Sequence, residues 1–483
     1  MALAPGREKA YHSIMRTLDM GWTTCALPDC AGVARGARGH CLAHLDPGEL
    51  DEVIGALRPG SAVDLRGTAI GDALLERILA ATGHRPGRAR FERAVFSGPA
   101  VFNGVVFLAD ATFDRSVFHH LASFLGARFE RNASFRETRF AQEFSLHRAA
   151  VSGHAAFDRM TVGSDALFSS ARFGRTASFE SADLRGFTTF DDAGFGGDAA
   201  FRGCRFGRAV SFRRTGFTGR AGFEAVRFAA AAYLTPAATR RRLTLADARA
   251  GARLVLSAEG CSVDLRRLSV TGPLTVRLKD AQTAMEGASL RGPATLTGRG
   301  SSRVTSLSGV DAALLHLDRV DLSTCRLADV RRPEGLRLTG CAFARTPHGV
   351  RFAWRWPPLR WWSPRQTLAD EHVWRGWAQA GDVPPPSPHS LAVLYSRLRT
   401  AVDDQSTAAD FHFAAMEMRR ITSGPARRWL LGLAWALGGY GLRMGRALVW
   451  SVVVTALVAA GLLASSASHA AHRAPVPAIR PSR

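Results

Sequence analysis

The sequence predicts an all-β repeat core, a four-sided coil of short strands with about 22 residues per coil, with a small N-terminal head and C-terminal α-helices. Phenylalanines recur at alternating steps of five and six residues, as in ATFDRSVFHHLASFLGARFERNASF (111–135). A smaller residue, most often Ala, stands two positions before most of these Phe. Four consecutive steps complete one coil, so equivalent sides of successive coils can stack in register.

The apolar positions repeat from Phe91 to Leu234 without a polar interruption. A simple strand does not explain them, because its faces alternate every two residues. An eleven-residue period can also produce a right-handed helical supercoil. That alternative calls for strong helix formers, whereas this stretch is rich in Phe, Ser, Thr, Gly and Arg.

A coil of short strands accounts for both features of the pattern. Each five- or six-residue unit forms one side, with its Phe and the small residue two before it pointing inward. Successive coils then stack about 4.8 Å apart. With four sides, one column contains Phe91, Phe113, Phe135, Phe157, Phe179, Phe201 and Phe223. A three-sided coil would shift the six-residue unit from side to side and spoil this register.

The pattern A-x-F-x-x resembles the pentapeptide-repeat proteins, whose repeat is A-(D/N)-L-x-x. One unit, Ala182-Asp183-Leu184-Arg185-Gly186, matches that repeat closely. The resemblance is greatest to a Phe-rich version with alternating spacing, found in actinobacterial proteins. It implies a right-handed four-sided β-helix and covers residues 91–234. The sixth residue of the longer units departs from the family pattern and is expected to bulge at a corner.

The composition constrains the partners and the compartment. The formal charge is +22, and nearly all the basic residues are Arg. This bias can reflect a GC-rich genome, or it can attract anionic lipid or nucleic acid. The first residues, MALAPGREKAYHS, predict no secretory signal. Seven cysteines without such a signal favour a reducing compartment over a disulfide framework.

The predicted head, residues 1–60, contains a candidate zinc site. Its ligands are Cys25, Cys30, Cys41 and His44, spaced C-x4-C-x10-C-x2-H. A short Gly-rich segment that cannot build its own core can be held by a tetrahedral zinc with three Cys and one His. The alternative is that these are small buried thiols in a loop. Family members have a similar C…C…CLAHL head, which favours the metal.

Two segments extend the predicted repeat. Residues 61–90 form an N-terminal cap, with repeat units at Leu65 and Ile70 and a short helix at 73–82 over the open end. Residues 237–345 keep the spacing more loosely, with Leu and Val in place of Phe, and predict an irregular continuation after the Phe-rich β-helix, 91–236. Cys204, Cys325 and Cys341 stand two before an apolar position and are interpreted as core fillers.

The next segment, 346–388, is rich in Trp and Arg and ends in a Pro-rich linker. Six of the ten Trp lie within 351–377. Three interpretations remain open: a cap over the last coil with Arg stacked on Trp, a membrane-interface segment, or a surface that stacks on nucleic-acid bases.

A helical hairpin is predicted over 389–428, with helices at about 390–402 and 407–421. The stretches Ala408–Phe413 and Met416–Arg420 resemble a segment that precedes the membrane domain in some family members. Asp410, His412 and Glu417 also have a spacing that can suit a metal, but a hairpin docked on the β-helix is favoured.

A membrane-associated region is predicted over 429–464. Residues 447–464, ALVWSVVVTALVAAGLLA, are uncharged and mostly apolar, and are expected to form one transmembrane helix. Arg residues crowd its N-terminal side, so the repeats are expected to be cytoplasmic. The shorter apolar stretch 429–442 could lie in the interface or pair with the main segment. The tail, 465–483, is expected to be disordered.

The predicted function is a non-enzymatic scaffold, anchored to the membrane, that presents a rigid β-helix to an unknown protein partner. No catalytic motif is recognised, although the alternative of a β-helix enzyme stays open. Gyrase binding by DNA mimicry is disfavoured, because residues 91–228 carry 18 Arg against 14 Asp and Glu. Direct nucleic-acid binding through Arg is also considered unlikely. A structural zinc and anionic lipid at the C-terminal segment complete the expected ligands.

Overall fold

A computed structural model describes residues 21–35, 38–236, 238–347, 350–352, 359–361, 365–379, 385–442 and 444–471 of the 483-residue chain. The chain divides into two compact units, Met1–Phe343 and Ala344–Arg483. The first unit contains the head and the repeats, and the second contains mainly helices.

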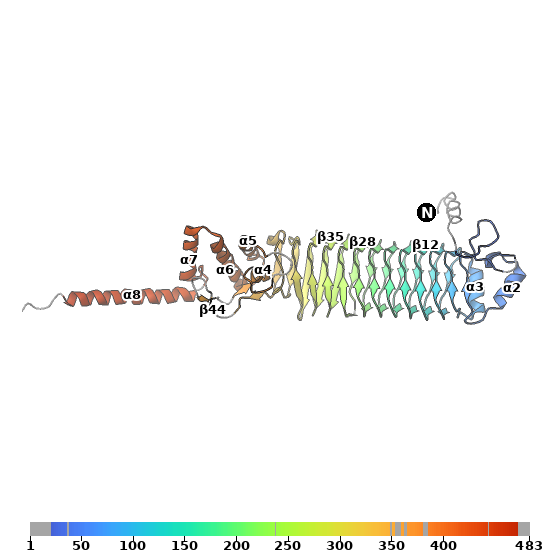
Figure 1. Ribbon diagram of the computed structural model, residues 1–483, viewed down its shortest axis with the longest axis horizontal. Helices are drawn as coiled ribbons and strands as arrows, with labels where there is room; N and C mark the ends of the chain where they lie inside the picture. The colour runs from blue at the N-terminus through green and yellow to red at the C-terminus, as the bar shows by residue number, and fades with distance from the viewer. Residues whose placement is uncertain are drawn as a thin grey trace, which may run out of the picture. The chain divides into compact units, whose positions relative to one another are not determined.

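The first unit is a β-helix of stacked coils, seen edge-on in Figure 1. Each strand pairs in parallel with the strands one coil before and one coil after it, as in Ala111↔Ala133↔Ala155. The offset between these partners equals the predicted length of one coil, so the predicted coil is confirmed. The two longest sides contain 12 strands each, so the β-helix is about 58 Å tall at ~4.8 Å per coil.

The strands belong to four sides, numbered here in chain order. Side 1 consists of β1 (Val63–Asp64), β3 (Ala89–Arg90), β7 (Ala111–Thr112), β11 (Ala133–Ser134), β15 (Ala155–Ala156), β19 (Ala177–Ser178), β23 (Ala199–Ala200), β27 (Ala221–Gly222), β31 (Arg242–Thr244), β34 (Ser262–Asp264), β37 (Gln282–Ala284) and β40 (Arg303–Ser306). Side 2 consists of β2 (Ala69–Ile70), β4 (Val95–Phe96), β8 (Val117–Phe118), β12 (Arg139–Phe140), β16 (Thr161–Val162), β20 (Asp183–Leu184), β24 (Arg205–Phe206), β28 (Arg227–Phe228), β32 (Arg249–Ala250), β35 (Ser269–Val270) and β38 (Ser289–Leu290).

Side 3 consists of β5 (Ala100–Val101), β9 (Ala122–Ser123), β13 (Phe144–Ser145), β17 (Ala166–Leu167), β21 (Thr188–Thr189), β25 (Val210–Ser211), β29 (Ala232–Leu234), β33 (Leu254–Glu259), β36 (Leu274–Lys279), β39 (Ala294–Arg299), β41 (Leu315–Asp318) and β42 (Arg337–Thr339). Side 4 consists of β6 (Val106–Phe107), β10 (Arg128–Phe129), β14 (Ala150–Val151), β18 (Arg172–Phe173), β22 (Gly194–Phe195), β26 (Gly216–Phe217) and β30 (Ala238–Thr239).

Stacked phenylalanine rings fill the interior of the four-sided section. In the column that begins at Phe91, successive ring centroids lie 4.8, 4.7, 5.4, 4.5, 4.9 and 4.7 Å apart. Rings from adjacent sides meet edge to face, as Phe113 and Phe124 do at 5.4 Å and 86°. Both arrangements are favourable for aromatic quadrupoles, so the predicted column is confirmed.

One coil keeps its volume by exchanging a large and a small residue. Leu146 stands where the coils above and below have Phe124 and Phe168. Two positions before it, Phe144 replaces the Ala of the neighbouring strands. Its ring lies 6.0 Å from that of Phe124 and 5.7 Å from that of Phe168. Dense packing is thereby preserved.

The corners explain the alternation of five and six residues. After a Phe that begins a five-residue step, the chain makes a tight turn, in which Ala94 N–H donates to Phe91 O at 3.0 Å. The third residue of this turn is left-handed, as Arg93 is at φ 57°. Six-residue steps instead cross a wider bend. The extra residue lies at these bends, as expected.

Acidic side chains at the corners bind the next coil. Asp165 Oδ1 accepts the N–H of Phe187 at 2.9 Å, and Asp198 Oδ1 accepts that of Arg220 at 2.8 Å. Glu137 lies between Arg115 and Arg159 of the adjacent coils and forms ion pairs with both. These carboxylates hold backbone and charge partners that lie one full coil away in the sequence.

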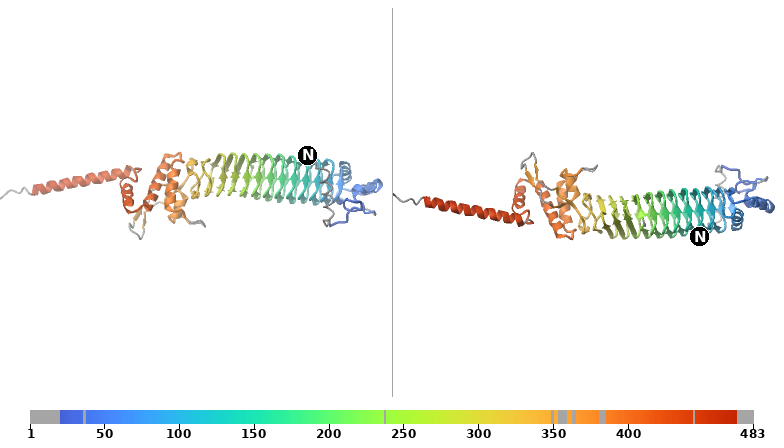
Figure 2. Two further views of the ribbon diagram at one scale, coloured as in Figure 1. Left: turned by 90° about the horizontal axis from the view of Figure 1, so that it is seen from above. Right: turned by 90° about the horizontal axis from the view of Figure 1, so that it is seen from below.

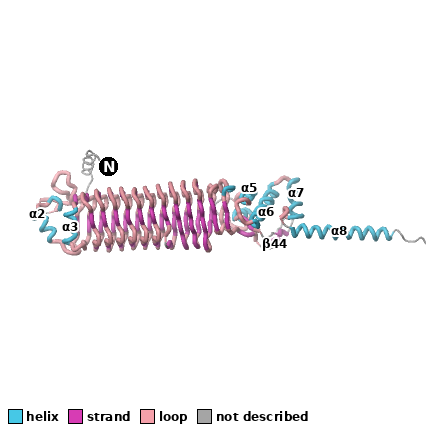
Figure 3. The backbone as a smooth tube through the Cα atoms, turned by 180° about the vertical axis from the view of Figure 1, so that it is seen from behind, coloured by secondary structure: helices cyan, strands magenta, loops and turns pink. Residues whose placement is uncertain are grey.

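The β-helix changes from four strands per coil to three after β30. Side 4 ends there, while the strands of side 3 lengthen from two residues to six in β33, β36 and β39. Figure 3 shows these longer strands toward the C-terminal end of the β-helix. The offset in residue number between register partners falls from 22 to 20, as Ala199↔Ala221 and Leu254↔Leu274 show. The four-sided coil predicted for residues 91–234 therefore does not extend into this section, because one long strand replaces two short ones and a corner.

The predicted continuation of the core through 237–345 is nevertheless confirmed. Apolar residues that keep the five- or six-residue spacing in this section are all buried: Leu245, Leu256, Leu265, Val270, Val276, Leu317, Leu322, Leu327, Leu338 and Phe343. Cys325 in this section and Cys204 in the Phe-rich section are fully buried, as expected for core fillers, whereas Cys341 is half-buried. A short helix, η2 (Pro333–Gly335), interrupts the last coils.

Helices cover the N-terminal end of the β-helix (Figure 2). The predicted helix at 73–82 is α3 (Asp72–Ala81), which buries Leu75, Ile78 and Leu79. It packs beside β5 and against α2 (Pro47–Gly55). The predicted units at Leu65 and Ile70 form β1 and β2 of the first coil. Unpaired strand edges are covered in this way.

The second unit begins with two short antiparallel pairs. These are β43 (Ala344–Arg345) with β46 (Gln366–Thr367), and β44 (Val350–Phe352) with β45 (Leu359–Trp361). The helices are α4 (Ala369–Trp374), α5 (Pro388–Leu398), α6 (Gln405–Thr422), α7 (Pro425–Gly438) and α8 (Met444–Ala471). The predicted hairpin corresponds to α5 and α6, which pack together.

The structure describes only part of the Trp- and Arg-rich segment. Trp354, Trp356 and Trp362 lie outside the described residues. Arg375 stacks on Trp374 and Trp377 at 5.3 and 5.1 Å, so Arg–Trp stacking occurs where the segment is described. The interpretations of the remainder stay untested.

A buried ionic network joins the elements of the second unit. Glu371 of α4 accepts from Arg365 and Arg375 at 2.6 Å each, and from the hydroxyl of Tyr395 in α5 at 2.5 Å. Glu417 of α6 contacts the same two arginines at 3.2 Å. These five side chains are almost fully buried. The network fixes α4, α5 and α6 to one another.

The transmembrane helix expected at 447–464 is not found. In the part of the chain that the structure describes, no helix combines the length and the apolarity needed to cross a membrane. The apolar run is shorter than the typical ~20 residues, and α8 continues at both ends into polar sequence. The predicted single-pass span is therefore wrong, and the orientation argument that placed the repeats in the cytoplasm loses its basis. Residues 465–471, expected in a disordered tail, are part of α8.

Candidate metal site

The head brings two short segments together around Cys25, Cys30, Cys41 and His44. Thr24 and Val33 form an antiparallel bridge, and the N–H of Cys25 donates to Gly32 O at 2.7 Å. This closes the Cys25–Cys30 loop. The second segment is the short helix η1 (Leu42–His44), which follows Cys41 and turns His44 back toward the cysteines.

The four ligand atoms lie within 4.8 Å of one another. Cys41 Sγ is 3.6 Å from Cys30 Sγ and 3.4 Å from His44 Nδ1, and Cys25 Sγ is 3.6 Å from His44 Nδ1. A tetrahedral zinc with Zn–S of about 2.3 Å and Zn–N of about 2.0 Å requires ligand separations of about 3.5–3.8 Å. The three separations of 3.4–3.6 Å are close to those of a zinc site, and the Cys30–Cys41 separation is far too long for a disulfide.

Gly32 makes room for this cluster. A Cβ at this position would lie 2.7 Å from Cys41 Cβ and 2.8 Å from Cys41 Sγ. The N–H of Gly32 also donates to Cys30 Sγ at 3.4 Å. Such a hydrogen bond favours the thiolate, which is the metal-binding form of cysteine.

The thiols interact strongly with each other. A hydrogen bond from Cys41, supported by the N–H of Gly32, lowers the pKa of Cys30 to about 5. The same hydrogen bond and burial raise the pKa of Cys41 well above its usual range. The pair therefore shares one proton, which a bound cation would displace.

The head is attached to the first coil. The N–H of Val33 donates to Arg66 O at 2.8 Å, and Arg35 Nη2 donates to Asp64 O at 3.1 Å. A Cβ on Gly67, at φ 62°, would lie 2.1 Å from Ala31 O. A metal that fixes residues 25–44 would thereby also fix the surface that covers this end of the β-helix.

All four ligands predicted from the sequence are brought together. With four protein ligands the site is closed, which is typical of structural rather than catalytic zinc. Among the described residues, no other group of three or more His, Cys, Asp or Glu is arranged to hold a metal ion. Asp410 instead accepts the N–H of Gln366 at 2.8 Å, Glu417 binds the arginines, and His412 contacts Arg399.

Gly32 is a part of this site that the sequence did not predict. Its only signal was its place between Cys30 and Cys41, which did not distinguish it from the other glycines of the head.

Comparison with known proteins finds a family model that matches part of the repeats. A family model described as "Pentapeptide repeats (9 copies)" matches residues 86–127. No curated protein and no solved structure shows significant similarity to the chain. The matched segment lies within the four-sided section, whose coils follow the register predicted from the phenylalanines.

Proposed function

We propose that this pentapeptide-repeat protein is a non-enzymatic scaffold whose β-helix presents a rigid side to a protein partner. The packed interior supports this proposal. Stacked rings and small residues occupy the inside of the Phe-rich coils, and these side chains are buried. Recognition must then use the outward residues of the sides and corners.

A column of three arginines on side 2 is the observation that carries the proposal. Arg205, Arg227 and Arg249 are register partners on β24, β28 and β32. All three are exposed, and none has an ion-pair partner within 4.0 Å in the part of the chain described. By contrast, arginines at the corners, such as Arg115 and Arg214, pair with a carboxylate one coil away.

Like charges at neighbouring positions of a sheet repel one another. The backbone ladder holds this column in place, so the repulsion is not relieved by movement of the strands. An acidic segment of a partner would relieve it and gain charge-assisted hydrogen bonds to the guanidinium forks. We therefore expect the partner to contact side 2 through Asp and Glu.

The test compares charge reversal in this column with reversal of paired arginines. Full-length protein is used to capture partners by cross-linking, and a captured partner is then titrated against purified variants. Arg205→Glu with Arg227→Glu should abolish binding, because both contacts become repulsive. Arg115→Glu with Arg159→Glu, around Glu137, is the matched control and should bind as the unmodified chain does.

Equal loss in both variants would refute the proposed face. The scaffold proposal would also be refuted if the protein had a catalytic activity that persisted after substitution of these arginines and if no protein partner were captured.

We propose that zinc in the head is structural. The closed ligand set and the ligand separations support this, and the head covers the end of the β-helix. The metal would then stabilise the scaffold without taking part in recognition.

A second candidate partner is an anionic lipid surface, which α7 would contact peripherally. This helix exposes Trp429, Leu430 and Leu433, with exposed fractions of 82, 70 and 57%, beside Arg427 and Arg428. An apolar face flanked by basic residues is typical of helices that lie in the membrane interface. Co-sedimentation with phosphatidylserine vesicles, but not with phosphatidylcholine vesicles, would support this contact. Leu430→Glu with Leu433→Glu should remove it.

A further inference from the structure

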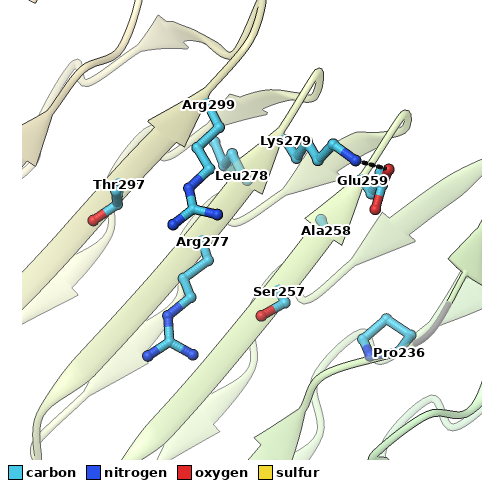
Figure 4. Close-up of a pocket in the computed structure, with 9 residues that line it drawn as sticks. All are labelled: Pro236, Ser257, Ala258, Glu259, Arg277, Leu278, Lys279, Thr297 and Arg299. Carbon is cyan, nitrogen blue, oxygen red and sulfur yellow. Dashed lines mark hydrogen bonds and ion pairs between the residues drawn. The ribbon is translucent and has the colours of Figure 1, made fainter.

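The long strands of side 3 form a concavity on the three-stranded section. Its volume is about 520 Å³, and it is lined by Pro236, Ser257, Ala258, Glu259, Arg277, Leu278, Lys279, Thr297 and Arg299. Figure 4 shows the outward side chains of β33, β36 and β39 along its floor. Pro236, after β29, stands at one margin.

Three cations gather on this floor. Glu259, Lys279 and Arg299 are register partners on three successive strands, and Arg277 stands two positions before Lys279 on the same face. Lys279 Nζ contacts Glu259 Oε1 at 2.6 Å. Within the described residues, neither Arg277 nor Arg299 has an ion-pair partner within 4.0 Å. Three cations and one carboxylate leave a net charge of +2.

Repulsion between two of these cations opposes the attraction between Lys279 and Glu259. Lys279 and Arg299 occupy directly neighbouring positions, where like charges destabilise a sheet. In Figure 4 the guanidinium groups of Arg277 and Arg299 extend to the same side of the strands. Hydroxyl groups of Ser257 and Thr297 lie in the same concavity. Arg277 and Thr297 are themselves register partners.

We propose that this concavity binds a small polyvalent oxyanion, specifically a diphosphate group. The Arg forks suit phosphate oxygens bidentately. The ammonium of Lys279 supplies a point charge, and the hydroxyls supply further donors. A diphosphate carries more than one negative charge and can contact two neighbouring cations at once, whereas a single carboxylate cannot neutralise the site. The inference is independent of the protein partner proposed for side 2.

The test is calorimetric titration of the full chain with inorganic pyrophosphate at physiological ionic strength. Binding should saturate at one pyrophosphate per chain, and inorganic phosphate should bind more weakly. Lys279→Gln with Arg299→Gln should weaken pyrophosphate binding by at least about tenfold. The reason is that one hydrogen bond to a charged group contributes at least as much free energy as a tenfold change in affinity requires.

The control removes the same charge from the four-sided section. Arg128→Gln with Arg172→Gln, both exposed on side 4, should change the affinity by less than about twofold, because distant exposed charges are screened. Both pairs are exposed, so unchanged melting temperatures should show that the variants fold.

Absence of saturable binding at millimolar pyrophosphate would overturn the proposal. Equal weakening by both pairs would also overturn it, since it would mean general charge attraction. If single-stranded oligonucleotides bound more tightly than pyrophosphate and through the same residues, the diphosphate proposal would be wrong, and the ligand would be a nucleic acid.

Discussion

Phe113 and Phe135 stack with their ring centroids 4.7 Å apart and their planes within 1°, although they belong to successive coils of the chain. The backbone of the same two coils is also paired, since Phe113 N–H donates to Ser134 O at 2.7 Å and Ala111 is the register partner of Ala133. The side-chain column and the strand ladder therefore share one repeat. This coupling gives the β-helix a single register and makes its outer sides rigid.

Phe157→Ala should destabilise the β-helix by about 3–5 kcal/mol, because it leaves a cavity between two stacked rings. Phe157 lies 5.4 Å from Phe135 and 4.5 Å from Phe179 and is fully buried. Phe187→Ala is the control, since Phe187 is 39% exposed at a corner. Urea unfolding followed by far-UV circular dichroism measures both. Similar midpoints for the two variants would contradict the stacked core.

Zinc should be present at one ion per chain in protein purified under reducing conditions. Cys41→Ser should lose it, since three ligands hold the metal less tightly than four. Cys204→Ser, a buried cysteine in the repeats, should retain one zinc. Elemental analysis gives the stoichiometry. Full-length protein without zinc, or equal loss in both variants, would rule out the proposed site.

The second unit should lose stability in acid through Glu371. Although burial raises the pKa of this carboxyl, attraction by Arg365 and Arg375 outweighs burial and lowers it below the usual 4.5. Its contribution is therefore present above the pKa of the unfolded chain and is lost as the pH falls toward the lower folded value. The free energy of unfolding should be steady above about pH 5.5 and fall below it.

Glu371→Gln tests that network directly. It should destabilise the unit by about 3–5 kcal/mol, because the buried Arg365 and Arg375 lose one of the carboxylates that they contact and keep the longer contacts to Glu417, and it should flatten the acid dependence. Asp46→Asn breaks an exposed pair with Arg38 and should cost less than about 1 kcal/mol. Urea titrations from pH 3 to 7 provide the comparison. If the free energy of unfolding of Glu371→Gln fell with decreasing pH as steeply as that of the unmodified chain, the acid sensitivity would belong to other groups.

The sequence pattern was sufficient to predict the fold where one residue type recurs on each side of the coil. Phe at alternating steps predicted the register of the four-sided coils, and the spacing of Cys25, Cys30, Cys41 and His44 predicted a cluster that the fold assembles. Both depend on local spacing along the chain, which the sequence shows directly.

The remaining features depend on contacts that local spacing does not show. Leu254, Leu256 and Ala258 alternate inward along β33, whereas the sequence predicted only an irregular continuation of short repeat units over 237–345. One long side replaces two short sides there, and the coil becomes shorter. Arg365 and Glu417 are 52 positions apart and meet only after folding. The apolarity of 447–464 was overinterpreted as a membrane span.

The shortening of the coil, from a register offset of 22 to one of 20, is tested most directly by pairs of introduced cysteines. Arg205 and Arg227 are neighbours in the four-sided section, and Ser269 and Ser289 are neighbours in the three-stranded section. Neighbouring strands bring Cα atoms to about 4.8 Å, within disulfide range. Ser269 and Arg291 keep the longer offset but should be separated by about 8 Å.

Mild oxidation followed by peptide mass spectrometry identifies the cross-linked pairs. Arg205→Cys with Arg227→Cys, and Ser269→Cys with Ser289→Cys, should each form a disulfide, whereas Ser269→Cys with Arg291→Cys should not. A disulfide between positions 269 and 291, with none between 269 and 289, would contradict the shortened coil and with it the concavity on side 3.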